Sequence, residues 1–166
     1  YTLKHHVYDF SDQLPSYVPK TMNDTPKNIH VDENGLHMYV NDRQTAQANI
    51  YTFHSDRQET TITQVPPIDE KLPLYAYQLT GGQWLMVAKK TYNYYLFYTE
   101  NDGTVVAEYP FYNSTAPDGC LVSEEENGDV NVMVGCMQNL DMYRYEKETS
   151  AFVMERHIDQ NSRTEN

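Results

Sequence analysis

Hydrophobic and polar positions alternate along much of the chain, and turn residues interrupt the alternation at regular intervals. The segment IHVDENGLHMYV (29–40) contains two alternating runs around Asn-Gly, and YAYQLTGGQWLMVA (75–88) repeats this plan around Gly-Gly. Alternation with period two predicts β-strands, and such dipeptides between two runs predict tight hairpin turns. The repeated segments show no helical period, so we predict an all-β protein.

The hairpins belong to a longer repeat of about 45 residues. NIYTFHSDRQETTI (49–62) matches NYYLFYTENDGTVV (93–106), and MYRYEKETSAFV (142–153) follows the same plan with one residue fewer. Each unit reads as strand, turn, strand, loop, strand, turn, strand, which predicts three antiparallel four-stranded units in a single domain, 1–166. The predicted units occupy residues 26–70, 73–115 and 117–158, with an N-terminal strand or extension at 1–25 and a polar tail at 159–166.

A repeat of this length with four antiparallel strands is typical of propeller blades, so we expect propeller-like packing of the three units. Segments such as WLMVA (84–88) are apolar on both faces, as strands between stacked sheets should be. Three blades are too few for a ring, because propellers typically use four to eight. A homodimer closing a six-bladed ring, further blades in a longer chain, or packing as a β-sandwich or barrel would each resolve this.

The turn TENDGTVV (99–106) resembles the Asp-box of sialidase-type propellers, in which Ser/Thr-x-Asp-x-Gly-x-Thr-Trp caps the turn between the last two strands of a blade. Thr99, Asn101 and Gly103 occupy the Ser/Thr, Asp and Gly positions, whereas valines replace the last two residues of the motif. Because the box is structural in those families, the resemblance implies a blade and no activity.

A second resemblance concerns GGQWLMVAKK (81–90), which is similar to the Gly-x-Trp segment of lipocalins through Gly82 and Trp84. In that family the segment opens the first barrel strand near the N-terminus, whereas here it lies mid-chain. The resemblance implies, as an alternative, a lipocalin-like barrel that carries a small hydrophobic ligand.

The two cysteines flank a third hairpin signal, at Asn-Gly 127–128. A three-residue loop over 127–129 would place Cys120 directly opposite Cys136, with Cα atoms about 5 Å apart, which a disulfide tolerates. We therefore predict a Cys120–Cys136 disulfide, with buried thiols as the alternative. A disulfide implies an oxidising compartment.

The net charge of −12, from 24 acidic and 12 basic residues, indicates an acidic surface. It disfavours nucleic acid and anionic membranes as partners, and no apolar run approaches the ~20 residues of a membrane-spanning helix. Because the sequence begins at Tyr1 rather than Met, we expect a removed leader, an upstream anchor or a longer parent protein. Sequons at Asn23 and Asn113 fit secretion. The expected location is extracellular or in the cell envelope.

The first hairpin offers a candidate metal site. A two-residue turn at 34–35 would place His30, Asp32 and His37 on one strand face, where two imidazoles and a carboxylate could ligate zinc. A polar face exposed to solvent is the alternative interpretation. The opposite face would then form the core, with Ile29, Val31, Met38 and Val40. The acidic turn 124–129 could bind calcium loosely or be a plain solvated turn. We expect no resident cofactor.

Aromatic residues crowd the middle unit: Trp84, Tyr94, Tyr95, Tyr98, Tyr109 and Tyr112. Such amphipathic rings suit contacts with a sugar or a peptide, and core packing between sheets is the alternative. The sequence contains no Gly-x-Ser-x-Gly motif and no phosphate-binding glycine loop. We therefore predict a non-catalytic binding or sensing module that recognises a protein or glycan. A small-ligand carrier and a glycan-active hydrolase remain as alternatives, since paired carboxylates need to meet only in space.

Overall fold

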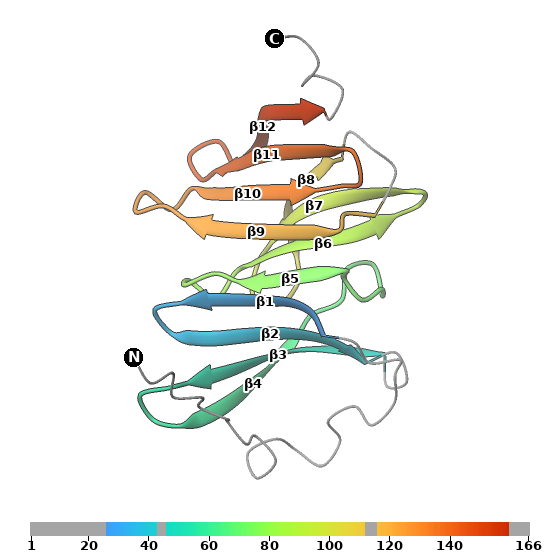
Figure 1. Ribbon diagram of the computed structural model, residues 1–166. Helices are drawn as coiled ribbons and strands as arrows, with labels where there is room; N and C mark the ends of the chain where they lie inside the picture. Colours follow the sequence, from blue (N-terminus) through green and yellow to red (C-terminus); the bar gives the residue numbers. More distant parts are fainter. Residues whose placement is uncertain (1–25, 43–45, 112–115, 160–166) are drawn as a thin grey trace, which may run out of the picture.

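The computed structural model describes residues 26–42, 46–111 and 116–159, which form twelve β-strands in three antiparallel sheets (Figure 1). Sheet 1 contains β1 (Pro26–Asp32), β2 (Gly35–Asp42), β3 (Gln47–His54) and β4 (Glu59–Val65). Sheet 2 contains β5 (Tyr75–Gln78), β6 (Trp84–Lys90), β7 (Asn93–Thr99) and β8 (Val105–Pro110). Sheet 3 contains β9 (Gly119–Glu124), β10 (Val130–Gly135), β11 (Asn139–Glu146) and β12 (Ala151–Asp159).

Each sheet is a meander in which sequence neighbours pair with one another. Short turns connect the strands, and short turns impose antiparallel pairing. These ranges contain no helix, so the predicted all-β class and the three repeated four-stranded units are confirmed. The predicted N-terminal strand, Tyr112, both sequons and residues 160–166 lie outside the described residues.

Sheet 2 lies between the other two sheets and is covered on both faces. Along β6, Trp84 and Met86 enter the apolar layer against sheet 1, whereas Leu85 and Val87 enter the layer against sheet 3. Successive strand residues point to opposite faces, which explains why this strand reads as a continuous apolar run. The layer between sheets 1 and 2 buries Tyr39, Ala48, Ile50, Val65, Ile68, Ala76, Trp84, Met86, Ala88 and Phe97.

The first strands of the three sheets adjoin at the centre of the molecule, where β1 contacts β9 and β5 lies beside them (Figure 1). The Asn28 amide contacts the Tyr77 hydroxyl and donates to the Cys120 carbonyl oxygen at 3.2 Å, and Tyr77 donates to the same carbonyl. The turns that follow β1, β5 and β9 all lie at one end of the molecule (Figure 1). The equivalent hairpins of the three units therefore converge.

The register of the first hairpin differs from the prediction by one turn position. Asp32 pairs with Gly35 and His30 with His37, so the turn comprises residues 33–34. Gly35 is needed in β2 rather than in the turn, because a Cβ at this position would lie 2.1 Å from the Phe53 carbonyl oxygen. A φ of +134° at Gly35 also disfavours any other residue.

The register of the third hairpin corrects the disulfide prediction. The loop comprises residues 126–128, closed by a bond from the Glu125 N–H to the Asp129 carbonyl oxygen at 2.8 Å. Cys120 consequently pairs with Val134, and Cys136 lies beyond the end of β10. A diagonal position about 7–8 Å away exceeds the Cα separation that a disulfide spans. Both cysteines are thiols in the structure, which does not contain the predicted Cys120–Cys136 disulfide.

The core face predicted for the first hairpin is correct for Val40, which is 4% exposed, but wrong for β1. His30 and His37 share one face, as predicted, but this face, which also carries Tyr39, packs towards sheet 2. Ile29 and Val31, which we expected in the core, are 62% and 69% exposed. The sheet is apolar on both faces, so the alternation within one hairpin could not decide which face is covered.

No sheet in the described ranges closes on itself, so the lipocalin-like barrel is wrong for this chain. Trp84 is fully buried between sheets, and its indole N–H donates to the Asn101 carbonyl oxygen at 3.1 Å. Asn101 belongs to the turn that resembles an Asp-box, which connects β7 and β8, the last two strands of sheet 2. In this turn the Asp102 carboxylate accepts the Thr104 backbone N–H at 2.9 Å, and this bond lowers the pKa of Asp102.

Candidate functional site

A polar groove opens where the first hairpins of the sheets converge. One hollow of about 410 Å³ lies between sheet 1 and the first hairpin of sheet 2, and a second of about 620 Å³ extends to the end of β9. The two hollows share seven lining residues, including His30, Asp32, Tyr77 and Thr80. We therefore describe them together as the groove.

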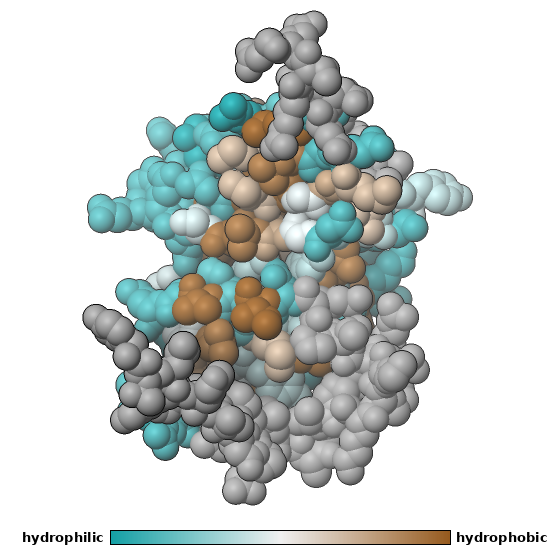
Figure 2. Space-filling view, in the orientation of Figure 1, coloured by the Kyte–Doolittle hydropathy of each residue, from teal (hydrophilic) through white to brown (hydrophobic). Residues whose placement is uncertain are grey.

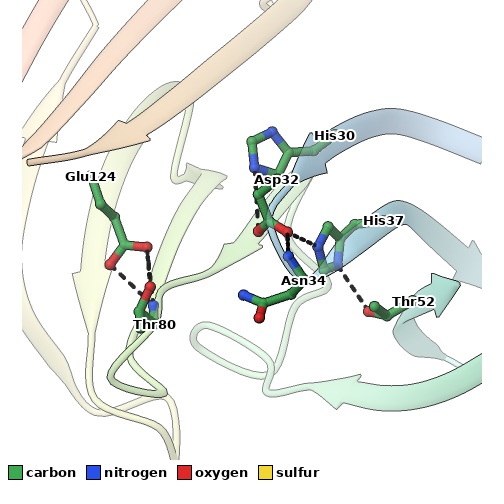
Figure 3. A network of polar contacts seen from close by, with 7 residues as sticks. All are labelled: His30, Asp32, Asn34, His37, Thr52, Thr80 and Glu124. Atoms are coloured by element: carbon green, nitrogen blue, oxygen red, sulfur yellow. Dashed lines mark hydrogen bonds and ion pairs between the residues drawn. The ribbon is translucent and has the colours of Figure 1, made fainter. Parts of the chain in front are cut away.

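The sheet 1 wall of the groove is a hydrogen-bonded cluster around Asp32 (Figure 3). One carboxylate oxygen lies 2.7 Å from Nε2 of His37 and accepts the Asn34 backbone N–H at 2.8 Å, and the other lies 3.8 Å from Nε2 of His30. His37 Nδ1 lies 2.8 Å from the Thr52 hydroxyl. Strand pairing explains the cluster, because His37 lies opposite both His30 on β1 and Thr52 on β3, on one face.

The surroundings of Asp32 favour its charged form. Partial burial raises its pKa, but the hydrogen bonds from His37 and the Asn34 N–H and the electrostatic influence of both imidazoles outweigh this effect, so that its pKa lies below the ordinary value of 3.8. A carboxylate that accepts from Nε2–H leaves Nδ1 of a neutral His37 as an acceptor for the Thr52 hydroxyl. The cluster therefore fixes the orientation of the imidazole.

The carboxylate, imidazole and hydroxyl of this cluster stand in the order found in nucleophilic triads. Thr52, however, is only 8% exposed, and its hydroxyl is engaged with the imidazole of His37. We interpret the order as a means of positioning His37.

The opposite wall is formed by the end of β9 and the turn after β5. Glu124 accepts the Thr80 backbone N–H at 3.0 Å and 3.1 Å through its two oxygens, and the Thr80 hydroxyl at 2.8 Å. Figure 3 shows this pair across the groove from Asp32, with the Asn34 amide projecting into the space between them. The wall is therefore held by hydrogen bonds that tie sheet 3 to sheet 2.

Acidic side chains line the groove and basic lysine or arginine side chains do not. Its lining residues include five carboxylates and three imidazoles but neither lysine nor arginine. The carboxylates belong to Asp32, Glu33, Glu124, Glu125 and Glu126. A concave surface lined by one sign of charge focuses its field and attracts ligands of the opposite sign. The groove therefore favours a positively charged group.

The predicted metal candidates do come together, with Asp32 between His30 and His37, but as a hydrogen-bonded cluster. Within the described ranges, no group of three or more His, Cys, Asp or Glu side chains is arranged to hold a metal ion. The acidic turn after β9 contributes its glutamates to the groove wall instead.

Five of the six aromatic residues predicted to bind a ligand are described by the structure, and these five do not line the groove. Trp84 is 0% and Tyr98 9% exposed, and the Tyr98 ring stacks on Tyr145 with centroids 3.8 Å apart. These two rings therefore belong to the core. The half-buried rings of Tyr94, Tyr95 and Tyr109 pack against the two apolar layers. A binding role for them stays a prediction, as it does for Tyr112, which lies outside the described residues.

Sequence reasoning missed the groove because it depends on residues far apart in the chain. The histidines of the first hairpin and the acidic turn of the third were each visible as polar interruptions of strand patterns. Their proximity depends on the contact between β1, β5 and β9, which no local pattern encodes. Two hairpins at equivalent places in a repeat, both with charged turns, were the available signal.

No protein-family model matches the chain, and a comparison with curated proteins gave no match. Among the residues that the structure describes, none belongs to a helix long and apolar enough to cross a membrane.

Proposed function

We propose that this chain is a non-catalytic binding module with propeller-like packing, which recognises a basic segment of a protein partner in the groove. The observation that carries the proposal is the lining of the groove, with five carboxylates and no lysine or arginine. A lysine or arginine side chain entering this space would donate charge-assisted hydrogen bonds to carboxylates such as those of Asp32 and Glu124, which hydrogen bonds already hold in place.

The aromatic side chains of the groove favour a peptide over a glycan. A sugar-binding site needs an exposed ring face on which the apolar face of a sugar can pack. The two tyrosines that line the groove, Tyr39 and Tyr77, are 1% and 6% exposed and engaged in hydrogen bonds at the sheet interfaces. The groove therefore offers charge and hydrogen bonds rather than a stacking platform.

The location of the groove supports the same proposal. Propeller blades surround a central channel, and here β1, β5 and β9 adjoin at the centre with the groove at the end of these strands (Figure 1). Each unit contributes an equivalent turn, so a ligand at this end would contact all three units. Fold-level analogy alone does not define a function, and the charge of the lining supplies the specific argument.

Binding of short synthetic peptides, measured by fluorescence anisotropy, tests the proposal. Lysine- and arginine-containing peptides should bind, whereas matched acidic peptides and neutral oligosaccharides should not. The double variant E33Q/E126Q removes two charges from the exposed turns of the groove. With exposed ion pairs worth about 0.2–1 kcal/mol each, it should weaken binding roughly 2- to 30-fold.

The control is E148Q, which removes an exposed charge from the β11–β12 turn, outside the groove lining. It should leave the affinity unchanged. Equal losses in both variants would mean that overall charge attracts the peptide without a site, and preferential binding of oligosaccharides would replace the peptide by a glycan.

A further inference from the structure

Two sheet faces of the molecule are not covered by another sheet. The outer face of sheet 1 exposes Ile29, Val31, Leu36 and Ile62, and that of sheet 3 exposes Leu121. Nine large hydrophobic side chains are exposed among the described residues, and these are five of them. Figure 2 shows apolar surface over both sheets on the same side of the molecule. Such a patch marks an interaction surface more often than a solvated one.

The two faces of each sheet differ: one packs on the preceding sheet in the chain and the other on the following sheet. Tyr95 on β7 packs in the layer facing sheet 1, and Tyr143 on β11 packs in the layer facing sheet 2, so this third-strand tyrosine faces the preceding sheet in both cases. The equivalent Tyr51 on β3 pairs with Met38 and Ile62, which places it on the outer face of sheet 1, where its side chain is 6% exposed. The outer face of sheet 1 is therefore of the kind that packs on a preceding sheet.

The outer face of sheet 3 is of the opposite kind. Met142 on β11 occupies the repeat position of Ile50 on β3 and Tyr94 on β7. Ile50 packs towards sheet 2 and Tyr94 towards sheet 3, so this position faces the following sheet. The outer faces of sheets 1 and 3 are therefore of the two kinds that pack against each other between sheets 1 and 2 and between sheets 2 and 3.

We propose that two copies of this chain assemble with two-fold symmetry into a closed ring of six sheets, in which the outer face of sheet 1 of each copy packs on the outer face of sheet 3 of the other. Six sheets lie within the range that closes a ring, whereas three do not. Both contacts are identical by symmetry, so the assembly stops at two copies.

The chemistry of the two faces fits this contact despite the net charge of −12 on each chain. The described side chains on the outer face of sheet 1 are aliphatic, aromatic, hydroxyl or amide groups and carry no charge. The outer face of sheet 3 has a hollow of about 150 Å³ lined by Leu121, Met133 and Met142, which suits an aliphatic side chain. The charged groups of this face include Glu155, which is paired with Arg144 at 3.1 Å, and the exposed Arg156, which lies opposite Met142.

Light scattering coupled to size-exclusion chromatography tests the proposal. The unmodified protein should elute as a dimer of about 39 kDa, which is twice the 19.4 kDa of one chain. V31E and L121E should each give a monomer, because each damages both contacts of its own dimer. An equimolar mixture of the two variants should regain a dimer fraction, because each mixed pair keeps one undamaged contact. M137E is the control, since Met137 is 82% exposed in the β10–β11 turn, and it should leave the dimer intact.

A monomer at every concentration of the unmodified chain would overturn the proposal. So would a dimer that only one of the two variants disrupts, because that result indicates like faces packing together, sheet 1 on sheet 1 or sheet 3 on sheet 3. Failure of the mixture to regain any dimer would also contradict it. Circular dichroism of each variant shows that it is folded, as expected for substitutions at exposed positions.

Discussion

Replacing Trp84 by alanine distinguishes a core residue from a ligand-binding one. Trp84 is 0% exposed between sheets 1 and 2. A tryptophan buries about 150–250 Å², worth roughly 4–6 kcal/mol at about 25 cal/mol per Å², which is an upper estimate. Truncation of a buried tryptophan costs about 3–5 kcal/mol, and we expect W84A to lose about 4 kcal/mol of unfolding free energy. This is a large part of the roughly 5–15 kcal/mol of a typical domain.

The measurement is urea denaturation followed by far-UV circular dichroism, since the variant lacks the only tryptophan of the chain. W84F is the matched control, because it keeps a ring but loses the indole bond to the Asn101 carbonyl oxygen. It should lose only about 1–2 kcal/mol. A loss below about 0.5 kcal/mol in W84A would place the ring at the surface and refute the stacking of sheets 1 and 2. The emission of Trp84 should also resist quenching by iodide.

Three further predictions follow from local features. In the native protein, a thiol reagent at mildly alkaline pH should modify the half-buried Cys136 first and Cys120 only on unfolding, because burial raises the pKa of Cys120 to about 12; an intact mass that shows a disulfide, with neither cysteine modified even after unfolding, would contradict this. The lowered pKa of Asp32 means that its charge stabilises the fold above its ordinary pKa of 3.8 and that this contribution is lost as the pH falls through the folded-state value. D32N should therefore be less stable than the parent chain near neutral pH, with the difference shrinking between about pH 5 and pH 3 in thermal melts; a constant difference would show that charge is not the cause. G35A should destabilise by more than about 1 kcal/mol, since its Cβ would meet the Phe53 carbonyl oxygen and its φ of +134° is unfavourable; chemical denaturation measures this, and an unchanged midpoint would count against the observed turn.

The sequence predicted the strand content and the three four-stranded units because these depend on local spacing. Period-two alternation and the turn dipeptides lie within single hairpins, and the third-strand tyrosines Tyr51, Tyr95 and Tyr143 mark the same strand of each unit. Turn position was less predictable. In both Asn-Gly hairpins the loop begins one residue earlier than predicted, with glutamate as its first residue.

The covered faces and the groove could not be predicted in this way. The first hairpin has apolar residues on both faces, and tertiary packing decides that Tyr39 is buried while Val31 is exposed. Asp32 and Glu124 are 92 positions apart in the chain and line the same groove only because β1 and β9 meet beside β5. The aromatic residues of the middle unit fitted both a binding and a packing interpretation. Trp84 and Tyr98 are buried because sheet 2 is covered on both faces.

Because sheet 2 is buried on both faces, we expect that neither end of the chain can be removed without unfolding the rest. Truncation after β8 would strip the cover from Leu85 and Val87, and deletion of β1 to β4 would uncover Trp84 and Met86. Neither half would keep its interior dry, so unfolding should proceed as one cooperative transition rather than sheet by sheet. New sheets could be accommodated at either end of the row, but none could be excised from its middle.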